Sequence, residues 1–91
     1  MAYFCYIVEC SDGSYYTGWS TDPYRRERQH NRGKGARYTR QHLPVRLVYI
    51  EEQPTRQAAM RREAALKKLA HNRKKQLIAI SSPESTQCNP T

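Results

Sequence analysis

The chain has 91 residues, of which 37% are hydrophobic, and its formal net charge at pH 7 is +8. A chain of this length forms one domain with a small core, and it contains no apolar run long enough to span a membrane. The first ten residues lack the basic and apolar regions of a signal peptide. The three cysteines (Cys5, Cys10 and Cys88) form neither a Cys-x-x-Cys pair nor a zinc spacing with the histidines. We therefore expect a cytoplasmic protein.

The positive charge is concentrated in two parts of the chain. No lysine or arginine precedes Arg25, seven occur from Arg25 to Arg40, and eight occur from Arg56 to Lys75. Two basic blocks of this density predict a surface that faces a polyanion, and we expect nucleic acid. A membrane surface is not expected, because the basic segments lack the bulky apolar face that interfacial binding requires.

The first predicted elements are two strands joined by a tight turn. Residues 3–9 and 14–20 are rich in Tyr, Ile, Val, Thr and Trp, and they bracket Ser11-Asp12-Gly13. An Asp-Gly pair between two such runs is typical of a β-hairpin.

A polar helix is predicted next, over residues 23–32, with Asp22 as its N-cap and Gly33 as its C-terminal stop. Beyond Tyr24 it has almost no apolar face, so contacts from elsewhere must stabilise it. We expect its polar side chains to be offered to a partner: Arg25, Arg26, Arg28, His30 and Arg32. Residues 33–40 are expected to form a basic loop with two glycine hinges.

The second half of the chain predicts one strand and two helices. Residues 45–51 form the strand, with Val45, Leu47 and Tyr49 on one face. A long helix over residues 55–70 and a short one over residues 72–80 follow, and the short helix should bring Leu77, Ile78 and Ile80 to the core. The order β-β-α-β-α-α describes an α+β domain over residues 1–80, and residues 81–91 are expected to be a disordered tail.

Glu63 lies at an unusual position on the predicted long helix. At 100° per residue it points the same way as Ala59, Leu66 and Ala70, and this stripe should face the core. A carboxylate buried in an apolar setting is costly. We therefore expect Glu63 to have a partner cation, which is either a basic side chain or a metal ion.

Four other polar or aromatic side chains stand out. Tyr6 and Tyr16 lie on the two hairpin strands, and Arg26 and His30 are four residues apart, so they share one face of the polar helix. Each of them alone has an ordinary structural explanation. Together with their neighbours they resemble the GIY-YIG nuclease domain, in the runs Phe4-Cys5-Tyr6 and Tyr16-Thr17-Gly18-Trp19-Ser20 followed by Arg26, His30 and Glu63.

The resemblance covers about residues 3–80 and is closest to the small stand-alone bacterial members of that family. Phe4-Cys5 and Thr17 replace the Gly-Ile and Ile of the family motifs, at positions set by packing. The resemblance implies a small three-stranded antiparallel sheet flanked by helices. It also requires both motif tyrosines on one face, which a strict two-residue Asp12-Gly13 turn would prevent. We therefore predict an odd-numbered loop or a bulge.

The resemblance further implies hydrolysis of phosphodiesters with one divalent metal ion, Mg²⁺ or Mn²⁺. Glu63 would bind this ion, and Tyr6 or Tyr16 would orient or deprotonate the attacking water. Arg26 would stabilise the charge that develops on the phosphate, and His30 would position water or contact phosphate.

Eight further basic residues are expected to bind the nucleic-acid backbone, with little base specificity: Arg25, Arg28, Lys34, Arg37, Arg40, Arg73, Lys74 and Lys75. Tyr38 is expected either to stack on an unpaired base or to pack its loop onto the sheet. We expect branched, nicked or single-stranded DNA, in preference to RNA or to a defined duplex sequence. The alternative is a basic nucleic-acid-binding module without catalytic activity, and Glu63 is the residue that separates the two hypotheses.

Overall fold

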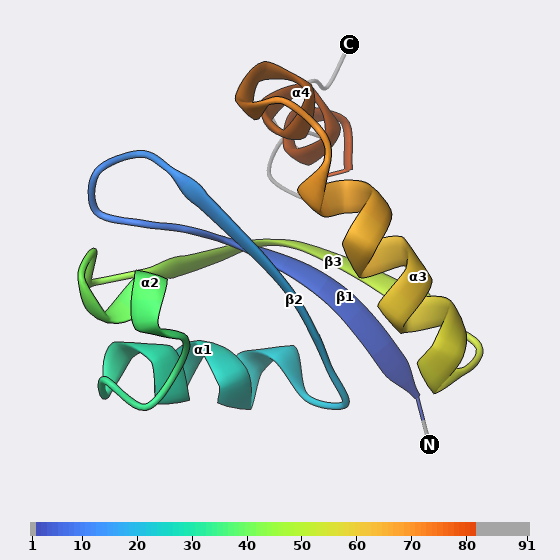
Figure 1. Cartoon of the computed structure of the whole chain (residues 1–91), viewed down its shortest axis with the longest axis horizontal. Coiled ribbons are helices and arrows are strands. Elements are labelled where there is room, and N and C mark those ends of the chain that lie inside the picture. The colour runs from blue at the N-terminus through green and yellow to red at the C-terminus, as the bar shows by residue number, and fades with distance from the viewer. Residues whose placement is uncertain (1, 82–91) are drawn as a thin grey trace, which may run out of the picture.

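A three-stranded antiparallel sheet with strand order β2-β1-β3 lies between two sets of helices in the computed structural model, which describes residues 2–81 (Figure 1). The elements, in chain order, are β1 Tyr3–Glu9, β2 Tyr15–Ser20, α1 Pro23–Asn31, α2 Arg37–Arg40, β3 Arg46–Gln53, α3 Arg56–Lys67 and α4 His71–Ser81. The expected α+β class and antiparallel sheet are confirmed. Nearly all of the tail expected to be disordered lies outside the described residues.

The loop between β1 and β2 has the odd length that the motif tyrosines require. Cys10 N donates to Ser14 O at 2.8 Å, Gly13 N donates to Cys10 O at 2.9 Å, and Gly13 has a φ of 86°. Glycine is favoured at such a left-handed position. The resulting register pairs Tyr6 with Gly18 and Val8 with Tyr16. Because paired residues share a face, Tyr6 and Tyr16 lie on the same side of the sheet, as predicted.

The two faces of the sheet carry separate hydrophobic clusters. One face, covered by α3, contains Cys5, Ile7 and Tyr49 together with helix residues Ala59 and Leu66, and the other contains Tyr6, Val8, Cys10 and Val45. Figure 1 shows α1 and α3 on opposite sides of the sheet. A helix on each face, the polar α1 on one and α3 on the other, therefore buries both sides of β1, the central strand.

A bulge in β3 overturns one expectation for this strand. Ile7 pairs with Tyr49 but Val8 pairs with Leu47, so Val48 is the extra residue. Such a residue reverses the alternation of side chains along a strand. Leu47 consequently packs in the cluster on the α1 side and Tyr49 in the cluster on the α3 side, and the expectation that both share a face is wrong.

The polar helix α1 is held by side-chain bonds to the backbone of β3 and of the residue before it. The Asn31 amide both accepts from Val45 N at 2.7 Å and donates to Val45 O at 2.9 Å. The Glu27 carboxylate accepts from Leu47 N at 2.7 Å. The bonds also satisfy backbone groups of Val45 and Leu47, which lie at the open edge of the sheet formed by β3. They supply the stabilisation that the sequence of α1 lacks.

The segment expected to be a basic loop contains the short helix α2. Gly33, with a φ of 78°, follows the end of α1, and residues 37–40 form one helical turn with Thr39 fully buried. Two more expectations are corrected further along the chain. Helix α3 ends at Lys67, so Ala70 lies beyond it and is exposed, and Ile80 on α4 is 77% exposed rather than in the core. No helix within residues 2–81 is long and apolar enough to cross a membrane.

Candidate functional site

Tyr6 lies at the centre of a polar cluster on the α1 side of the sheet. Its side chain extends from β1 across Gly18 of β2, and a Cβ atom at Gly18 would lie 2.6 Å from the Tyr6 hydroxyl oxygen. The motif glycine is therefore required because any side chain would occupy the place of this phenol. Tyr6 is 1% exposed, and burial raises its pKa to about 12 although the nearby Arg26 guanidinium lowers it.

His30 faces the sheet rather than a partner, which corrects the expectation that it belongs to the open surface of α1. Its ring is fully buried, its Nε2 atom lies 3.0 Å from the Tyr6 hydroxyl, and its Nδ1 atom lies 2.9 Å from the Thr39 hydroxyl. Burial, with a smaller contribution from the positive charge of Arg26, lowers the pKa of His30 to about 4. The imidazole is therefore neutral near pH 7.

Arg26 and Tyr16 complete the cluster on this face. Arg26 is partly buried, its Nη1 donates to Gln29 Oε1 at 2.9 Å, and its charge lowers the pKa values of both Tyr6 and His30. The Tyr16 ring meets the His30 ring edge to face, with centroids 5.4 Å apart, and remains partly exposed. The structure thus brings four of the predicted site residues together from β1, β2 and α1.

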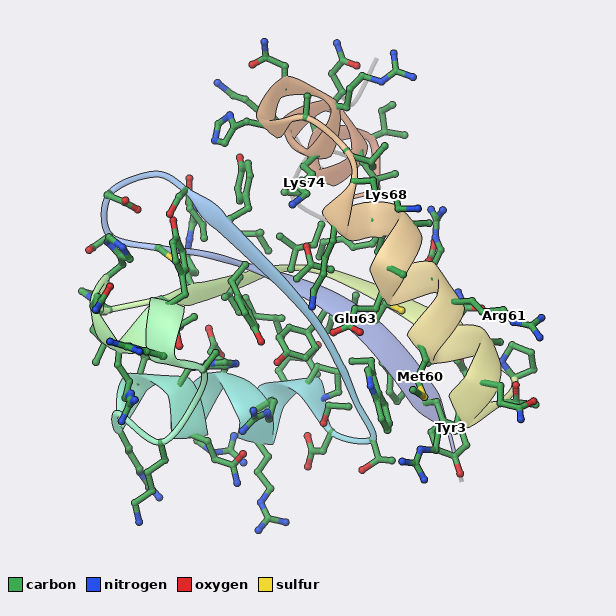
Figure 2. The ribbon with its side chains drawn as sticks, viewed as in Figure 1. Tyr3, Met60, Arg61, Glu63, Lys68 and Lys74 are labelled. Carbon is green, nitrogen blue, oxygen red and sulfur yellow. The ribbon has the colours of Figure 1, made fainter. Side chains whose placement is uncertain are left out.

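Glu63 comes from α3, the helix on the other face of the sheet. Figure 2 shows it on the side of α3 that faces the strands, whereas Arg61 points away from them. Its side chain is 21% exposed, so the expectation of a buried carboxylate is wrong, and Lys67 Nζ lies 3.5 Å from Glu63 Oε2. The negative charge of Glu63 is one of the influences that raise the pKa of Tyr6. Glu63 therefore influences the polar cluster around Tyr6 through its charge. In the described residues it forms no hydrogen bond or ion pair with that cluster.

The surroundings of Glu63 fit a metal held by one protein carboxylate. Residues 2–81 contain no group of three or more His, Cys, Asp or Glu side chains placed to hold a metal ion. Mg²⁺ commonly binds through one or two carboxylates, with water and substrate phosphate as the other ligands. The partly exposed Glu63 carboxylate could bind such an ion if the Lys67 ammonium, which lies 3.5 Å from Glu63 Oε2, moved away from it.

Basic residues of α1 and of the segment that follows it line a hollow next to the polar cluster. The hollow has a volume of about 280 Å³ and is lined by Arg25, Arg28, Gln29, Arg32 and Lys34. Gln29 lies between the two regions, because it lines the hollow and also bonds to Arg26. Three of the residues predicted to bind nucleic acid (Arg25, Arg28 and Lys34) therefore gather beside Arg26.

The other residues predicted to bind nucleic acid are more scattered. Arg37 and Arg40 are exposed on α2, and Arg73 and Lys75 are exposed on α4, whereas Lys74 is partly buried. Burial and the charge of Lys67 lower the pKa of Lys74. Figure 1 shows α4 and α1 at opposite ends of the view, and Figure 2 shows Lys74 on α4. This lysine therefore lies away from the basic residues of α1.

Tyr38 is tied to the β1–β2 loop. Its hydroxyl donates to Ser14 Oγ at 2.6 Å, and its ring lies against His42, with centroids 4.6 Å apart. The Tyr38 side chain nevertheless remains 41% exposed. These contacts join Tyr38 to the β1–β2 loop and to its own segment, and whether it stacks on an unpaired base stays a prediction.

The sequence pattern did not single out three residues that shape the site. Thr39 and Gly35 lie against His30, where a Cβ atom at Gly35 would overlap with His30 Nδ1, and Gln29 bonds to Arg26. Gly35 and Thr39 belong to the segment that was expected to form a basic loop with two glycine hinges. Gln29 could have been found from the sequence, because residues three apart on a helix, such as Arg26 and Gln29, lie side by side.

Comparisons with known proteins identify relatives of the whole folded part. Residues 2–76 match the GIY-YIG catalytic domain. The chain is 52% identical over 75 residues to a UPF0213 protein of Haloquadratum walsbyi, covering 82% of this chain and 84% of that protein. It is 54% identical over 65 residues to a UPF0213 protein of Streptococcus sanguinis, covering 71% and 75% of the two chains. The solution NMR structure of a UPF0213 protein from Bacillus halodurans superposes with a TM-score of 0.60 at 41% identity, covering 100% of this chain and 98% of that one.

Proposed function

Since the chain belongs to the GIY-YIG catalytic domain family, we propose that it is an endonuclease that hydrolyses phosphodiester bonds in DNA with the help of one divalent metal ion. The family is a family of nucleases, its substrate class is nucleic acid, and its members generally depend on divalent metals. The meeting of Tyr6, Tyr16, Arg26 and His30 on one face of the sheet is the observation that carries the proposal for this chain.

Arg26 is proposed to stabilise the charge that develops on the scissile phosphate. Its guanidinium is partly buried between Gln29 and the Tyr6–His30 pair, so its position is fixed before the substrate binds. A preorganised cation in a partly desolvated site acts more strongly than one in water, and one such donor is typically worth about 3 kcal/mol of transition-state stabilisation.

The two tyrosines are proposed to bind and orient the attacking water. A phenol with a pKa of about 12, as for Tyr6, is ionised in only about one molecule in 10⁵ at pH 7. Tyr6 consequently takes up a proton from water only if it passes its own proton onward, and His30 lies within hydrogen-bond distance to receive it. Tyr16 is more exposed and can contact the same water directly.

Glu63 is proposed to hold Mg²⁺ or Mn²⁺, and such an ion supplies Lewis-acid polarisation of the phosphate oxygens when bound. The Tyr6 hydroxyl lies over Gly18 of β2, an edge strand, and α3 also packs on β1 and β2. A phosphate placed at this edge of the sheet would lie near both the Tyr6 hydroxyl and Glu63. Lys67, now paired with Glu63, would then be free to contact the substrate.

The substrate is proposed to be DNA with branched, nicked or single-stranded structure. The basic hollow beside Arg26 is lined by side chains suited to phosphates, and phosphate contacts carry no sequence information directly. Binding should therefore weaken steeply with salt and depend on the shape of the DNA more than on its sequence.

The test is cleavage of single-stranded, duplex, nicked, flap and junction DNAs in Mg²⁺ and in Mn²⁺. We expect metal-dependent cutting of at least one branched or single-stranded substrate by the wild type, and at least a hundredfold less by Glu63→Gln. Arg61→Ala is the matched control, because Arg61 lies on the same helix but points away from the strands. Equal cutting by the wild type and Glu63→Gln would refute the role of Glu63.

The basic hollow favours one other function, a nucleic-acid-binding module without catalytic activity. The same panel separates the two. A pure binding module would hold DNA with a steep salt dependence, would cut none of the substrates in either metal, and would bind equally well after Glu63→Gln.

A further inference from the structure

The ring of His30 is bonded at both nitrogens inside the protein. Nε2 lies 3.0 Å from the Tyr6 hydroxyl and Nδ1 lies 2.9 Å from the Thr39 hydroxyl, and the residue is fully buried. A neutral imidazole carries one hydrogen, so one of these nitrogens donates and the other accepts. The identity of the donor decides whether Tyr6 gives or receives its hydrogen bond.

Thr39 settles the direction. Its hydroxyl donates to the carbonyl oxygen of Ala36 at 2.8 Å, and a carbonyl oxygen can only accept. Because a hydroxyl has a single hydrogen, Thr39 Oγ1 must accept from His30. The hydrogen of the imidazole is therefore on Nδ1, and Nε2 carries the lone pair. It follows that the Tyr6 hydroxyl donates to His30 Nε2.

We propose that Thr39 is a positioning residue that holds His30 in the Nδ1–H tautomer, so that Nε2 is ready to accept the proton of Tyr6. Its part in catalysis rests on the proposed nuclease function, whereas the tautomer itself does not. Three donated bonds run in one direction, from Tyr6 to His30, from His30 to Thr39, and from Thr39 to the Ala36 carbonyl.

The neighbourhood of His30 leaves the ring no other arrangement of partners. Gly35 covers the Nδ1 side so closely that a Cβ atom there would overlap with the ring. Tyr16 from β2 meets the ring edge to face, and Arg26 on α1 is the charged group that acts on it. A nearby positive charge disfavours a second proton on the imidazole, which keeps Nε2 free in the absence of substrate.

The arrangement gives a proton path in which Tyr6 stays neutral. As the water oxygen forms its bond to phosphorus, one water proton moves to the Tyr6 oxygen and the original Tyr6 proton moves to His30 Nε2. The ester oxygen leaves with the electron pair of the broken P–O bond and takes a proton from solvent, and His30 later returns its proton through Tyr6 to solvent, so that no net proton is gained or lost by the protein. In the opposite tautomer Nε2 already carries a hydrogen, and this transfer is blocked.

A purely structural role for Thr39 predicts something different. A threonine hydroxyl commonly bonds to a nearby backbone carbonyl for local structural reasons alone, here across the first turn of α2. In that case the loss of the hydroxyl would change stability without changing the tautomer of His30 or the pH dependence of cleavage.

The experiment is histidine-selective ¹H–¹⁵N NMR of the full chain, which distinguishes the two neutral tautomers of each ring. We expect wild-type His30 to be in the Nδ1–H form at pH 7 and to remain neutral at pH 5. Thr39→Val should shift it to the Nε2–H form or to a mixture, and Thr39→Ser should restore the wild-type form. An Nε2–H form in the wild type would overturn the proposal, and this result requires no variant to fold.

Cleavage supplies the second readout. We expect Thr39→Val to cut about 10- to 100-fold more slowly than the wild type, the cost seen when the orienting partner of a metal-bound histidine is lost, and Thr39→Ser to recover most of the rate. A Thr39→Val protein with unchanged tautomer and unchanged rate would overturn the proposal. If the wild type cuts no DNA but Thr39 still controls the tautomer, the proposed nuclease function fails and the positioning of His30 by Thr39 stands.

Discussion

Replacing Gly18 by alanine should push Tyr6 away from His30. A Cβ atom at position 18 would lie 2.6 Å from the Tyr6 hydroxyl oxygen, 2.8 Å from Cζ and 3.1 Å from Cε2. These separations are shorter than van der Waals contact, so the ring must move. Tyr6 is 1% exposed and His30 fully buried, so the movement would strain the core and disrupt a hydrogen bond that water cannot easily replace.

The magnitude follows from three contributions. Overpacking a core costs about 1–3 kcal/mol, and loss of a buried hydrogen bond costs about 1 kcal/mol more. The lower backbone entropy of alanine in the unfolded chain returns about 0.5–1 kcal/mol. The net expectation is a loss of about 2 kcal/mol in the free energy of unfolding, together with loss of the cleavage activity.

Urea denaturation of four proteins tests this reasoning: the wild type, Gly18→Ala, Tyr6→Phe and the double variant. Part of the clash disappears with the Tyr6 oxygen, so Gly18→Ala should cost less in the Tyr6→Phe background. A cost below about 0.5 kcal/mol in the wild-type background, or the same cost in both backgrounds, would refute the account of why glycine occupies position 18.

Three further predictions concern stability. Asn31→Ala should lower the free energy of unfolding by about 2 kcal/mol, since Val45 N and O both lose their partner; calorimetry showing an unchanged melting temperature would contradict this. Thr17→Val should raise stability by about 1 kcal/mol, because the Thr17 hydroxyl is buried without a hydrogen-bond partner in the described part of the chain; a loss in urea denaturation would show that the hydroxyl is needed. The pKa of His30 is about 4 in the folded state and 6.5 in the unfolded state. As the pH falls from 6.5 to 4, the imidazole is therefore protonated in the unfolded state but not in the folded state. Stability present above pH 6.5 should therefore decrease by about 3 kcal/mol towards pH 4, and a profile that is the same in a His30→Gln variant would show that another group is responsible.

The sequence was most informative where the determinants of structure are local. Asp12-Gly13 between two strand-like runs predicted the hairpin, whereas its odd loop was predicted from the resemblance to the GIY-YIG domain, which requires Tyr6 and Tyr16 on one face. The Asp22 N-cap and the buried positions Ala59 and Leu66 were also found from spacing alone. Each of these depends on residues within one or two turns of each other.

The structure differs from the sequence prediction where distant segments decide the outcome. His30 is buried because Asn31 and Glu27 bond to backbone groups 14 and 20 residues away, which no local period reveals. The bulge at Val48 likewise arises from pairing with β1. Glu63 was placed on the same stripe as Ala59 and Leu66, which are fully buried, but its carboxylate is partly exposed and pairs with Lys67.

The same distinction applies to the candidate site. Arg26, His30 and the two tyrosines could be named from their match to the GIY-YIG motifs, but their hydrogen bonds could not be predicted. Thr39 was hidden in a segment whose glycines suggested a mobile loop, although it forms a fully buried turn against His30. Its contribution depends on the close approach of Gly35 to the ring, which is a property of the folded backbone.

The proposal that Arg26 stabilises the transition state of phosphodiester hydrolysis is tested most directly with Arg26→Ala. Its single-turnover rate of DNA cleavage in Mn²⁺ is measured at saturating protein, together with its affinity for the same DNA. We expect the rate to fall about a hundredfold or more, equivalent to about 3 kcal/mol, while affinity changes only a few-fold because the basic hollow is retained. Arg61→Ala serves as the control and should match the wild type in both measurements. A variant that binds more weakly but cleaves at the wild-type rate once saturated would contradict the claim that Arg26 acts on the transition state.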